Sequence, residues 1–413
     1  MKDILKRVLD KIKPTKQEEK EFRSSVTSFL AKLNKRLKDS KAILGGSGAK
    51  GTWLRSIYDV DVFVKFSYSK YKNKSDEISG LLEKFLKGFR AVRLHGSRDY
   101  FQIKQGRFVF EIIPILDIKR PSQAKNITDI SPLHANWVLR NKKFCDDIRL
   151  VKKFCKANKV YGAESYINGF SGYVCEILTI YYKGFENFVR NAVKWKPKVI
   201  VDIKKYHKKP LDEINNSKIT GPLIVVDPVQ AGRNASAALS YEKFDMLVNA
   251  CRKFLKKPSN KFFEEEKTDA KGLKKGAKGK KLILFDVKTN KGKVDVIGCK
   301  VWKVFEFVKA RMNKEGFGLI ESGWEYDKKD KALLWFILKK EKLDKLKEWT
   351  GPPLKSKENV ERFKKKYKNT FVKGRRVYAK VKREYVDVDE LVKDLVKEDY
   401  VKEKIKSIKI HNL

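Results

Sequence analysis

The chain has 413 residues, which at about 150 residues per domain suggests two to four domains and at least one sizeable hydrophobic core. Its 96 lysines and arginines exceed its 51 aspartates and glutamates by 45 charges, while 41% of its residues are hydrophobic and 12% are aromatic. That apolar content excludes a wholly disordered basic chain. The charge predicts a polyanionic partner, of which nucleic acid is the commonest and a membrane surface is the alternative.

Several other classes are disfavoured by the pattern of apolar residues and cysteines. No window approaches ~20 consecutive apolar residues, and the most apolar stretch, 170–182, is interrupted by Glu176. Residues 1–21 alternate Lys and Glu with apolar residues, which predicts an amphipathic helix and not a targeting segment. The five cysteines are spread singly, so neither a zinc site nor a disulfide framework is predicted, and we expect a reducing, cytoplasmic setting.

The first segment, 1–140, is expected to combine helices with a sheet. Helical periodicity covers 4–12 and 22–37, followed by a glycine-rich turn at 45–48. Charged and apolar residues alternate along 59–66, which predicts a strand with one polar face. The nearly continuous apolar run 107–115 predicts an interior strand.

The predicted secondary structure changes twice along the rest of the chain. Residues 141–258 are mainly helical in pattern, with one helix expected to open at Ser240, and 264–281 resemble an exposed linker. The C-terminal part is predicted to alternate short elements: strand 281–287, helix 301–312, a hairpin of 317–326 and 332–338, a turn at 351–353, helix 358–367 and strand 377–381. We therefore predict an α+β multidomain fold: a mixed-sheet head at 1–140, a central domain at 141–258, and an α+β body and tail at 259–413, the tail at roughly 301–375.

Three carboxylates carry the most specific chemical signal. Asp59 and Asp61 stand two residues apart in the predicted strand, so both project from one face, about 6.5 Å apart along the backbone. Glu111 interrupts the apolar strand and needs a partner, because an isolated buried charge is very costly. A divalent cation shared by all three would satisfy both conditions, and hard oxygen ligands with open positions for phosphate suit Mg²⁺. Such a triad supports a two-metal displacement at phosphorus.

Two alternative interpretations of this stretch are weaker. Residues 46–51 also match the G-x-G-x-x-G signature of dinucleotide-binding folds, but a helical segment precedes them and the acidic pair begins only 13 residues after Gly46. The acids could also lie on a solvated edge strand with ordinary ion pairs. The adjacent Gly-Ser turn, whose backbone N–H groups can approach phosphate, favours the metal interpretation.

At this point the chain resembles a known family. Gly46 and Ser47, followed by Asp59 and Asp61, are similar to the signature of the polymerase-β nucleotidyltransferase superfamily, and more narrowly to the archaeal, class I CCA-adding enzymes, a family of tRNA nucleotidyltransferases. The ordered motifs that carry the resemblance span nearly the whole chain: 12–15, 46–55, 161–164, 169–173, 226–229 with Arg233 and Asn234, and 351–353 with Glu358 and Asn359.

The resemblance implies a polymerase-β-like head and roles for individual residues. It implies Asp59, Asp61 and Glu111 as catalytic, Mg²⁺-binding carboxylates. It further implies contacts to the nucleotide from the following six residues, of which Arg233 would read the base edge together with the tRNA end: Ser47, Lys50, His134, Lys152, Tyr161 and Arg233. From the residues alone, His134 could equally cap a helix, Lys152 could belong to a solvated face, and Tyr161 and Arg233 could be ordinary core and surface residues.

Two positions depart from the family pattern. The third carboxylate is commonly Asp but here is Glu111, one methylene longer, and Lys50 stands where Arg is usual, giving a point charge in place of a bidentate fork. Both changes keep the required charge. Asp117 is the alternative third ligand if the register of the strand differs.

The expected reaction is addition of C, C and A to the 3′ end of tRNA from CTP and ATP, without a template and with release of pyrophosphate. A related poly(A) polymerase or another terminal nucleotidyltransferase is the alternative enzyme, and a noncatalytic double-stranded-RNA-binding protein is the alternative from another class. The C-terminal basic clusters 364–368, 373–376 and 380–383 are expected to contact the tRNA acceptor stem, each with a solvated face as its alternative. The resemblance also implies a homodimer, and no membrane partner is expected.

Overall fold

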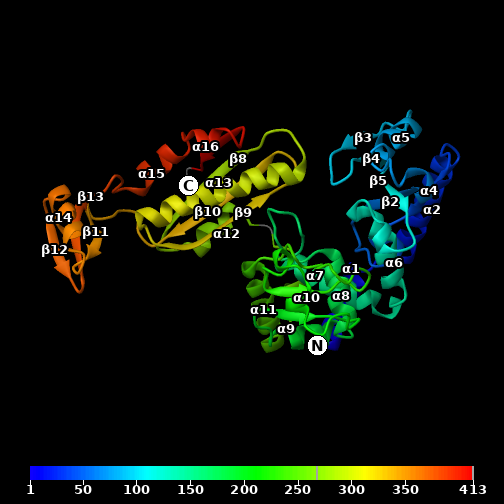
Figure 1. The fold of residues 1–413 in the computed structure, drawn as a ribbon, viewed down its shortest axis with the longest axis horizontal. Coiled ribbons are helices and arrows are strands. Elements are labelled where there is room, and N and C mark those ends of the chain that lie inside the picture. Colours follow the sequence, from blue (N-terminus) through cyan, green and yellow to red (C-terminus); the bar gives the residue numbers. More distant parts are fainter. Residues whose placement is uncertain (267, 412–413) are drawn as a thin grey trace. The chain divides into compact units, whose positions relative to one another are not determined.

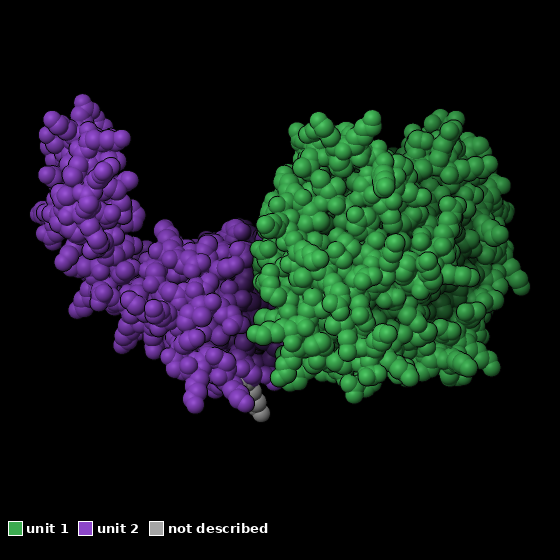
Figure 2. All heavy atoms as spheres, turned by 90° about the horizontal axis from the view of Figure 1, so that it is seen from below, with its two compact units in different colours: residues 1–266 green, residues 267–413 purple. Residues whose placement is uncertain are grey.

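The computed structural model describes residues 1–266 and 268–411. These form two units, Met1–Glu266 and the remainder of the chain, which are coloured separately in Figure 2 and drawn as a ribbon in Figure 1. The described residues of the first unit contain two large hydrophobic cores, one around a sheet and one among helices, and a small cluster of four residues within 214–226. None of the helices in the described ranges has the length and apolarity needed to cross a bilayer.

A five-stranded mixed sheet organises the N-terminal half of the first unit. Its order is β1-β2-β5-β4-β3, and only the central β2–β5 pair is parallel. The elements of this half are β1 (Ser40–Leu44), β2 (Asp59–Ser67), β3 (Val92–Leu94), β4 (Tyr100–Gln105) and β5 (Phe108–Asp117), with helices α2 (Lys16–Asn34), α3 (Gly46–Lys50), α4 (Tyr68–Tyr71), α5 (Ile78–Phe85) and α6 (Ser131–Leu139), and short 3-10 turns η1 (Pro121–Gln123) and η2 (Ile127–Ile130).

The core of the sheet explains which way its acidic residues point. Val60 and Val62 of β2 pair in register with Phe110 and Ile112 of β5, and all four are buried against α2, where the Phe29 and Phe110 rings stack 4.1 Å apart. Because successive side chains of a strand point to opposite faces, the intervening Asp59 and Asp61 must project from the other face. Burial of the valines thus fixes the orientation of the aspartates.

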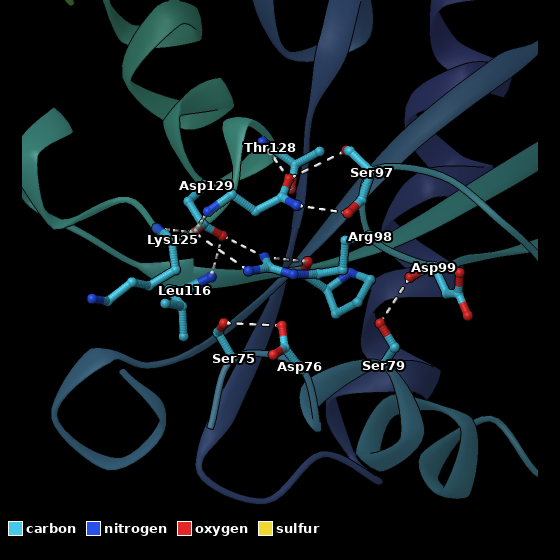
Figure 3. A network of polar contacts seen from close by, with 12 residues as sticks. Ser75, Asp76, Ser79, Ser97, Arg98, Asp99, Leu116, Lys125, Thr128 and Asp129 are labelled. Carbon is cyan, nitrogen blue, oxygen red and sulfur yellow. Dashed lines mark hydrogen bonds and ion pairs between the residues drawn. The ribbon is translucent and has the colours of Figure 1, made fainter. Parts of the chain in front are cut away.

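The far end of β5 is held by a buried ion pair. Asp129 accepts hydrogen bonds from Arg98 Nη1 at 2.5 Å and from the backbone N–H of Leu116 at 2.9 Å, as Figure 3 shows. It also accepts from the backbone N–H groups of Lys125 and Asn126. This fully satisfied carboxylate ties β5 to the loops on either side of it, which stiffens the strand that carries Glu111.

Helices dominate the second half of the first unit, and the N-terminal helix joins them. Val8 and Ile12 of the first helix belong to the same core as α7 and α8, although they come from the N-terminus. The elements are α1 (Lys2–Ile12), η3 (Lys142–Phe144), α7 (Cys145–Ala157), α8 (Gly172–Tyr181), α9 (Phe185–Ala192), α10 (Pro210–Glu213), η4 (Asn216–Lys218), α11 (Tyr241–Lys256), η5 (Asn260–Phe263) and a parallel strand pair, β6 (Val199–Val201) and β7 (Leu223–Val225).

The second unit is an α+β assembly with two small sheets. A four-stranded antiparallel sheet of order β14-β8-β10-β9 packs on a long helix, and a separate three-stranded sheet has the order β11-β13-β12. The elements are α12 (Ala270–Gly276), β8 (Lys281–Lys288), α13 (Val294–Glu315), β9 (Leu319–Tyr326), β10 (Lys331–Leu338), β11 (Leu346–Pro353), α14 (Lys357–Lys366), β12 (Thr370–Lys373), β13 (Arg376–Lys382), α15 (Val388–Leu395), α16 (Asp399–Lys402) and β14 (Ser407–Ile410).

Most expected elements are confirmed, including the interior position of β5, the β9–β10 hairpin and the Ser240 cap of α11. Three expectations were wrong in detail. Residues 46–50 form a short helix, α3, and not only a turn; residues 351–353 end strand β11 with a bulge; and α12 lies inside the expected linker. The bulge lets Gly351 face Phe363 of α14 and Val377 of β13 where a side chain would clash, so glycine serves packing there. The domain boundaries stay predictions.

Candidate active site

The strand register places the three predicted carboxylates on one face of the sheet. Asp61 pairs directly with Glu111 across the parallel β2–β5 ladder, and Asp59 lies two residues before Asp61 on the same side. Neighbouring strands are about 4.8 Å apart, so Asp61 and Glu111 are adjacent. Glu111 accepts a hydrogen bond from Gln102 of β4 at 3.3 Å, and Asp117 lies six residues further on, opposite Ser67 and paired with Lys65 at 2.6 Å. The register therefore favours Glu111 over Asp117 as the third acid.

The glycine-rich start of α3, from its N-cap Gly45 onward, packs tightly against Asp61. The backbone N–H of Gly45 donates to the carbonyl oxygen of Asp61 at 2.8 Å. Gly46 has φ +52°, and a Cβ atom at this position would overlap the Asp61 carboxylate. Glycine is needed at position 46 for both reasons, since only glycine adopts this conformation freely and leaves room for the acid. Ser47 follows at once, so the segment brings Ser47 beside the carboxylate face.

Asp61 is a carboxylate without enough compensation for its burial. Desolvation raises the pKa of Asp61, which Lys50 and Lys152 lower only in part and the neighbouring Asp59 raises further. A half-buried acid next to a second acid favours binding of a cation, because a cation offsets both the cost of desolvation and the repulsion.

The carboxylate face fits a divalent metal by its donor chemistry. Three oxygen-donating acids on adjacent strands match the ligand set that Mg²⁺ prefers. Within residues 1–266 and 268–411, no three acidic, histidine or cysteine side chains are already gathered as a metal cluster. The metal-binding role of Asp59, Asp61 and Glu111 therefore stays a prediction, supported by the register and by the electrostatic environment of Asp61.

A buried glutamate gathers two of the predicted nucleotide-binding lysines. Glu176 of α8 is 1% exposed, and its two oxygens receive Lys50 Nζ at 2.8 Å and Lys152 Nζ at 2.7 Å. Thr52 completes the group: its hydroxyl donates to Glu176 and accepts from Lys152. The two ammonium groups outweigh the cost of desolvation and lower the pKa of Glu176 to about 2. The group keeps a net positive charge of about one at neutral pH.

A second buried acid, Asp227, connects the remaining predicted residues. One oxygen accepts from His134 Nε2 at 3.0 Å and Arg233 Nη1 at 2.6 Å; the other accepts from the Tyr173 hydroxyl at 3.0 Å and the Val229 backbone N–H at 2.9 Å. Desolvation opposes the charge, but hydrogen bonding to His134 with the other donors lowers the pKa of Asp227 to about 2. His134 and Arg233 are therefore brought together by one carboxylate.

Aromatic contacts join the two acid-centred groups. The Tyr173 ring stacks on His134 at 4.1 Å and lies 5.5 Å from Lys50 Nζ. At Gly172, the residue before it, a Cβ atom would lie only 2.8 Å from the Tyr161 hydroxyl, so a side chain there would displace Tyr161; the same Cβ would lie 3.7 Å from the Lys152 side chain, in ordinary contact. Tyr161 thus lies beside Lys152, and burial raises its pKa. Unit 1 brings all nine predicted site residues to the carboxylate face or to this polar network.

Four members of this network were not identified as site residues from the sequence: Thr52, Tyr173, Glu176 and Asp227. Glu176 had a usable signal, because it is the one charged residue within the most apolar stretch and a buried charge requires partners. Tyr173 belongs to an apolar stripe of helical spacing, which is typical of a core residue, and Asp227 precedes Pro228, which is typical of a turn. Only the fold shows that they orient the predicted residues.

Three family models match successive parts of the chain. Residues 26–134 match the nucleotidyltransferase domain, residues 146–264 the second domain of tRNA nucleotidyltransferase, and residues 278–408 the C-terminal domain of CCA-adding enzyme. Together with the mixed sheet and its acidic face, these matches define the chain as a nucleotidyltransferase.

Relatives that align with nearly the full chain identify its family within the nucleotidyltransferases. The chain is 34% identical to the CCA-adding enzyme of Nanoarchaeum equitans over 366 residues, which cover 87% of this chain and 88% of that protein. It is 31% identical to the CCA-adding enzyme of Methanocaldococcus jannaschii over 415 residues, covering 96% and 91%. The chain belongs to the archaeal CCA-adding enzyme family.

Solved structures support the fold. A structure of the Cid1 poly(U) polymerase with Mg and 3′-dATP bound covers 64% of this chain and 98% of its own, with a TM-score of 0.52 and 16% identity. A cytoplasmic RNA terminal U-transferase covers 65% and 100%, with a TM-score of 0.51 and 15% identity. At these identities the likeness confirms the nucleotidyltransferase fold alone.

Proposed function

We propose that this enzyme adds C, C and A in turn to the 3′ end of tRNA, using CTP and ATP and releasing pyrophosphate. The observation that carries the proposal is an acidic sheet face, Asp59, Asp61 and Glu111, beside a buried, net positive group of Lys50, Lys152 and Glu176. A binding protein for polyanions gains nothing from clustered acids, whereas phosphoryl transfer uses both charges. Membership of the CCA-adding enzymes supplies the substrates.

The cationic residues would bind the triphosphate. Lys50 and Lys152 are already ordered by Glu176 and Thr52, so binding a phosphate would not require these side chains to lose rotamer freedom. Ser47 beside the carboxylate face, and His134 and Tyr161 in the polar network, would offer hydroxyl and ring N–H groups to phosphate or sugar oxygens. The substrate would thus be held with its α-phosphate toward the acidic face.

The acidic face would hold Mg²⁺ through Asp59, Asp61 and Glu111. When bound, the metal would offset negative charge on the triphosphate and on the departing pyrophosphate. The 3′-hydroxyl of the tRNA would attack the α-phosphate, and the bond to pyrophosphate would break. The residues contribute mainly by positioning these groups in line.

Base selection would depend on Arg233. Its guanidinium is held by Asp227 at 2.6 Å and remains partly exposed, so N–H groups that do not face Asp227 can meet a base edge. Without a template, discrimination must come from such hydrogen bonds together with the end of the tRNA.

Incorporation of labelled CTP and ATP into tRNA that lacks its terminal trinucleotide tests the proposal. We expect two C additions, then one A, and no further extension. Unlimited addition of A would favour a poly(A) polymerase, and addition of other nucleotides another terminal transferase. Tight tRNA binding without pyrophosphate release under any condition would favour the noncatalytic RNA-binding alternative.

The tRNA contacts, assembly and location remain proposals. Lys364, Lys373 and Lys380 belong to the C-terminal basic clusters on α14, β12 and β13, which would contact the sugar-phosphate backbone of the acceptor stem. Such contacts predict that tRNA affinity falls steeply as salt rises. A homodimer is likewise proposed from family membership. A cytoplasmic location is proposed from the scattered cysteines, and the domain limits at 140 and 258 from the sequence.

A further inference from the structure

Arg233 lies on a short hairpin loop, residues 226–234, whose base is closed by backbone contacts. Val226 and Asn234 form an antiparallel bridge, and the backbone N–H of Asp227 donates to the carbonyl of Arg233 at 3.0 Å. The side chain of Asn234 accepts from the backbone N–H of Val225 at 3.0 Å, which ties the loop to β7. The base is therefore fixed by its own backbone.

The tip of the loop is held from outside by the segment that follows β6. The Tyr206 hydroxyl donates to the carbonyl of Pro228 at 2.9 Å. His207 Nε2 lies 2.9 Å from the carbonyl oxygen of Ala231, two residues before Arg233. The backbone N–H of His207 in turn donates to Asp202 at 3.0 Å, which anchors the histidine to the end of β6.

Both ring nitrogens of His207 face groups that can only accept hydrogen bonds. Nε2 faces the Ala231 carbonyl, and Nδ1 lies 2.9 Å from a carboxylate oxygen of Glu213 in α10. A neutral imidazole has one N–H donor and one acceptor nitrogen, so it can satisfy only one of these partners, whereas an imidazolium satisfies both. The side chain is 12% exposed, so water cannot readily replace a lost partner. The hydrogen bond to the Ala231 carbonyl and the interaction with Glu213 raise the pKa of His207 above its usual 6.5.

We infer that His207, in its doubly protonated form, is a positioning residue that holds the loop carrying Arg233 and thereby supports nucleotide selection. The inference rests on the proposed role of Arg233 at the base edge. The charged groups around His207 are Glu213 from α10, Asp202 after β6, the adjacent Lys208, and, on the loop itself, Arg233 with its partner Asp227. The two acids nearest the ring favour its charged form.

The sign of the effect follows from linkage. Because the pKa of His207 is raised in the folded state, its stabilisation of the loop is complete below the unfolded value and is lost as pH rises through the folded value. Above that pH one of the two ring contacts must break. The loop then loses an anchor near Arg233, so nucleotide binding should weaken while the chemistry at the acidic face stays intact.

The test compares wild type, His207→Gln and His95→Gln from about pH 5.5 to about pH 9, a range that brackets the ordinary histidine pKa of ~6.5. His95 is the matched control, because it also contacts a carboxylate, Asp99, but is 85% exposed and lies away from the loop. We expect KM for CTP and ATP in wild type and His95→Gln to rise about tenfold across the titration, the equivalent of one hydrogen bond. In His207→Gln we expect KM to be high at every pH, with kcat at saturating nucleotide near that of wild type.

A second readout does not depend on activity. Hydrogen exchange of peptides covering 226–234, corrected for the intrinsic pH dependence of exchange, should show protection that wild type loses above the His207 pKa and that His207→Gln lacks throughout. If exchange behaves so but KM does not, the role given to Arg233 fails and the loop anchor stands. A His207→Gln profile identical to wild type in both measurements would overturn the inference.

Glu213→Gln provides an independent variant should His207→Gln fold poorly. The amide keeps an acceptor oxygen but removes the negative charge, so the pKa of His207 should fall. Both the KM rise and the loss of protection should then occur at lower pH than in wild type. Unchanged transitions in Glu213→Gln would also overturn the inference.

Discussion

Asp61 is a half-buried and Glu176 a fully buried carboxylate of the same unit, and their electrostatic environments are opposite. Glu176 contacts two ammonium groups and a hydroxyl, and its pKa is lowered to about 2. Asp61 lies beside Asp59 and under Gly46, and its pKa is raised by burial. The fold provides Glu176 with positively charged partners, whereas the negative charge of Asp61 is only partly compensated.

This difference indicates different roles for the two acids: Glu176 orders neighbouring side chains, whereas Asp61 keeps a charge that a bound ligand can offset. Glu176 stabilises the fold and sets the direction of Lys50 and Lys152. Asp61 holds uncompensated charge at the place where a metal and a triphosphate are proposed to bind, which is how sites for phosphoryl transfer acquire affinity for cations. Neutralising Asp61 should therefore reduce mainly activity, whereas neutralising Glu176 should reduce mainly stability.

The largest effect is expected for Asp61→Asn. Loss of a metal carboxylate should lower kcat for CTP incorporation by about a thousandfold or more, a fall typical of losing a principal electrostatic group. Removing an uncompensated buried charge should at the same time raise the free energy of unfolding by about 1 kcal/mol. Steady-state kinetics and urea unfolding measure the two quantities.

Asp117→Asn is the matched control for Asp61→Asn. Asp117 is an exposed acid at the end of β5, paired with Lys65. We expect activity close to wild type and a stability change within about 0.5 kcal/mol. Equal loss of activity in both variants would contradict the assignment of Glu111 over Asp117 and the distinction drawn for Asp61.

Glu176→Gln should affect stability more than activity. It leaves Lys50 and Lys152 buried beside each other without a counter-charge, so the free energy of unfolding should fall by about 3 kcal/mol. KM for nucleotide should rise because the lysines are no longer oriented, although kcat should fall less than in Asp61→Asn. Glu242→Gln, on the exposed start of α11, is the control and should change stability by no more than about 0.5 kcal/mol. A Glu176→Gln protein as stable as wild type would contradict the difference proposed between Asp61 and Glu176.

Lowering the pH of the wild-type enzyme should reduce activity and folding stability at different pH values, because Asp61 and Glu176 have different pKa values. Activity requires ionised Asp61, so kcat/KM should fall about tenfold per pH unit once the pH drops below its raised pKa. Glu176, whose pKa is lowered from 4.5 to about 2, contributes stability that is present above 4.5 and lost between these values. Activity should therefore decline at higher pH than the Glu176 part of the folding stability. Parallel profiles of kcat/KM and unfolding free energy against pH test the order.

The smallest effect is expected for Tyr173→Phe. The ring keeps its stacking on His134, and only the hydroxyl that donates to Asp227 is lost. Asp227 retains donors from His134, Arg233 and Val229, so we expect a stability loss of about 1 kcal/mol and a few-fold rise in KM. Tyr181→Phe, on the exposed side of the same helix, serves as the control. A loss as large as that of Glu176→Gln would show that the two acid-centred groups are not separable.

The sequence alone predicted the elements whose patterns are local. The alternation of Asp59, Val60, Asp61 and Val62 specified a strand with one acidic face, because burial of every second residue leaves no other orientation. The apolar run around Glu111 specified an interior strand, which is β5. The family resemblance, carried by short ordered motifs, predicted nine site residues, and it predicted the class of enzyme, which the full-length relatives confirmed.

Local patterns failed where neighbours distant in the sequence decide the outcome. The glycines of 45–48 predicted a turn, yet packing against β2 and α6 makes residues 46–50 a helix. The run 351–353 reads as a turn in isolation, but pairing with β13 extends the strand through a bulge. In both cases tertiary contacts override propensities that differ by only about 1 kcal/mol per residue.

The sequence by itself thus determined the sheet with its acidic face, the order of the parts and the chemistry of the carboxylates, because periodicity and motif spacing are written along the chain. The tertiary structure alone decided that Glu176 would serve Lys50 and Lys152, that Asp227 would join His134 to Arg233, and that His207 would hold the Arg233 loop. These partners are separated by 24 to 126 residues, save for the local Asp227–Arg233 pair. A charged residue in an apolar stretch of sequence indicates that a partner is needed, but only the packing of the fold determines which residue that partner is.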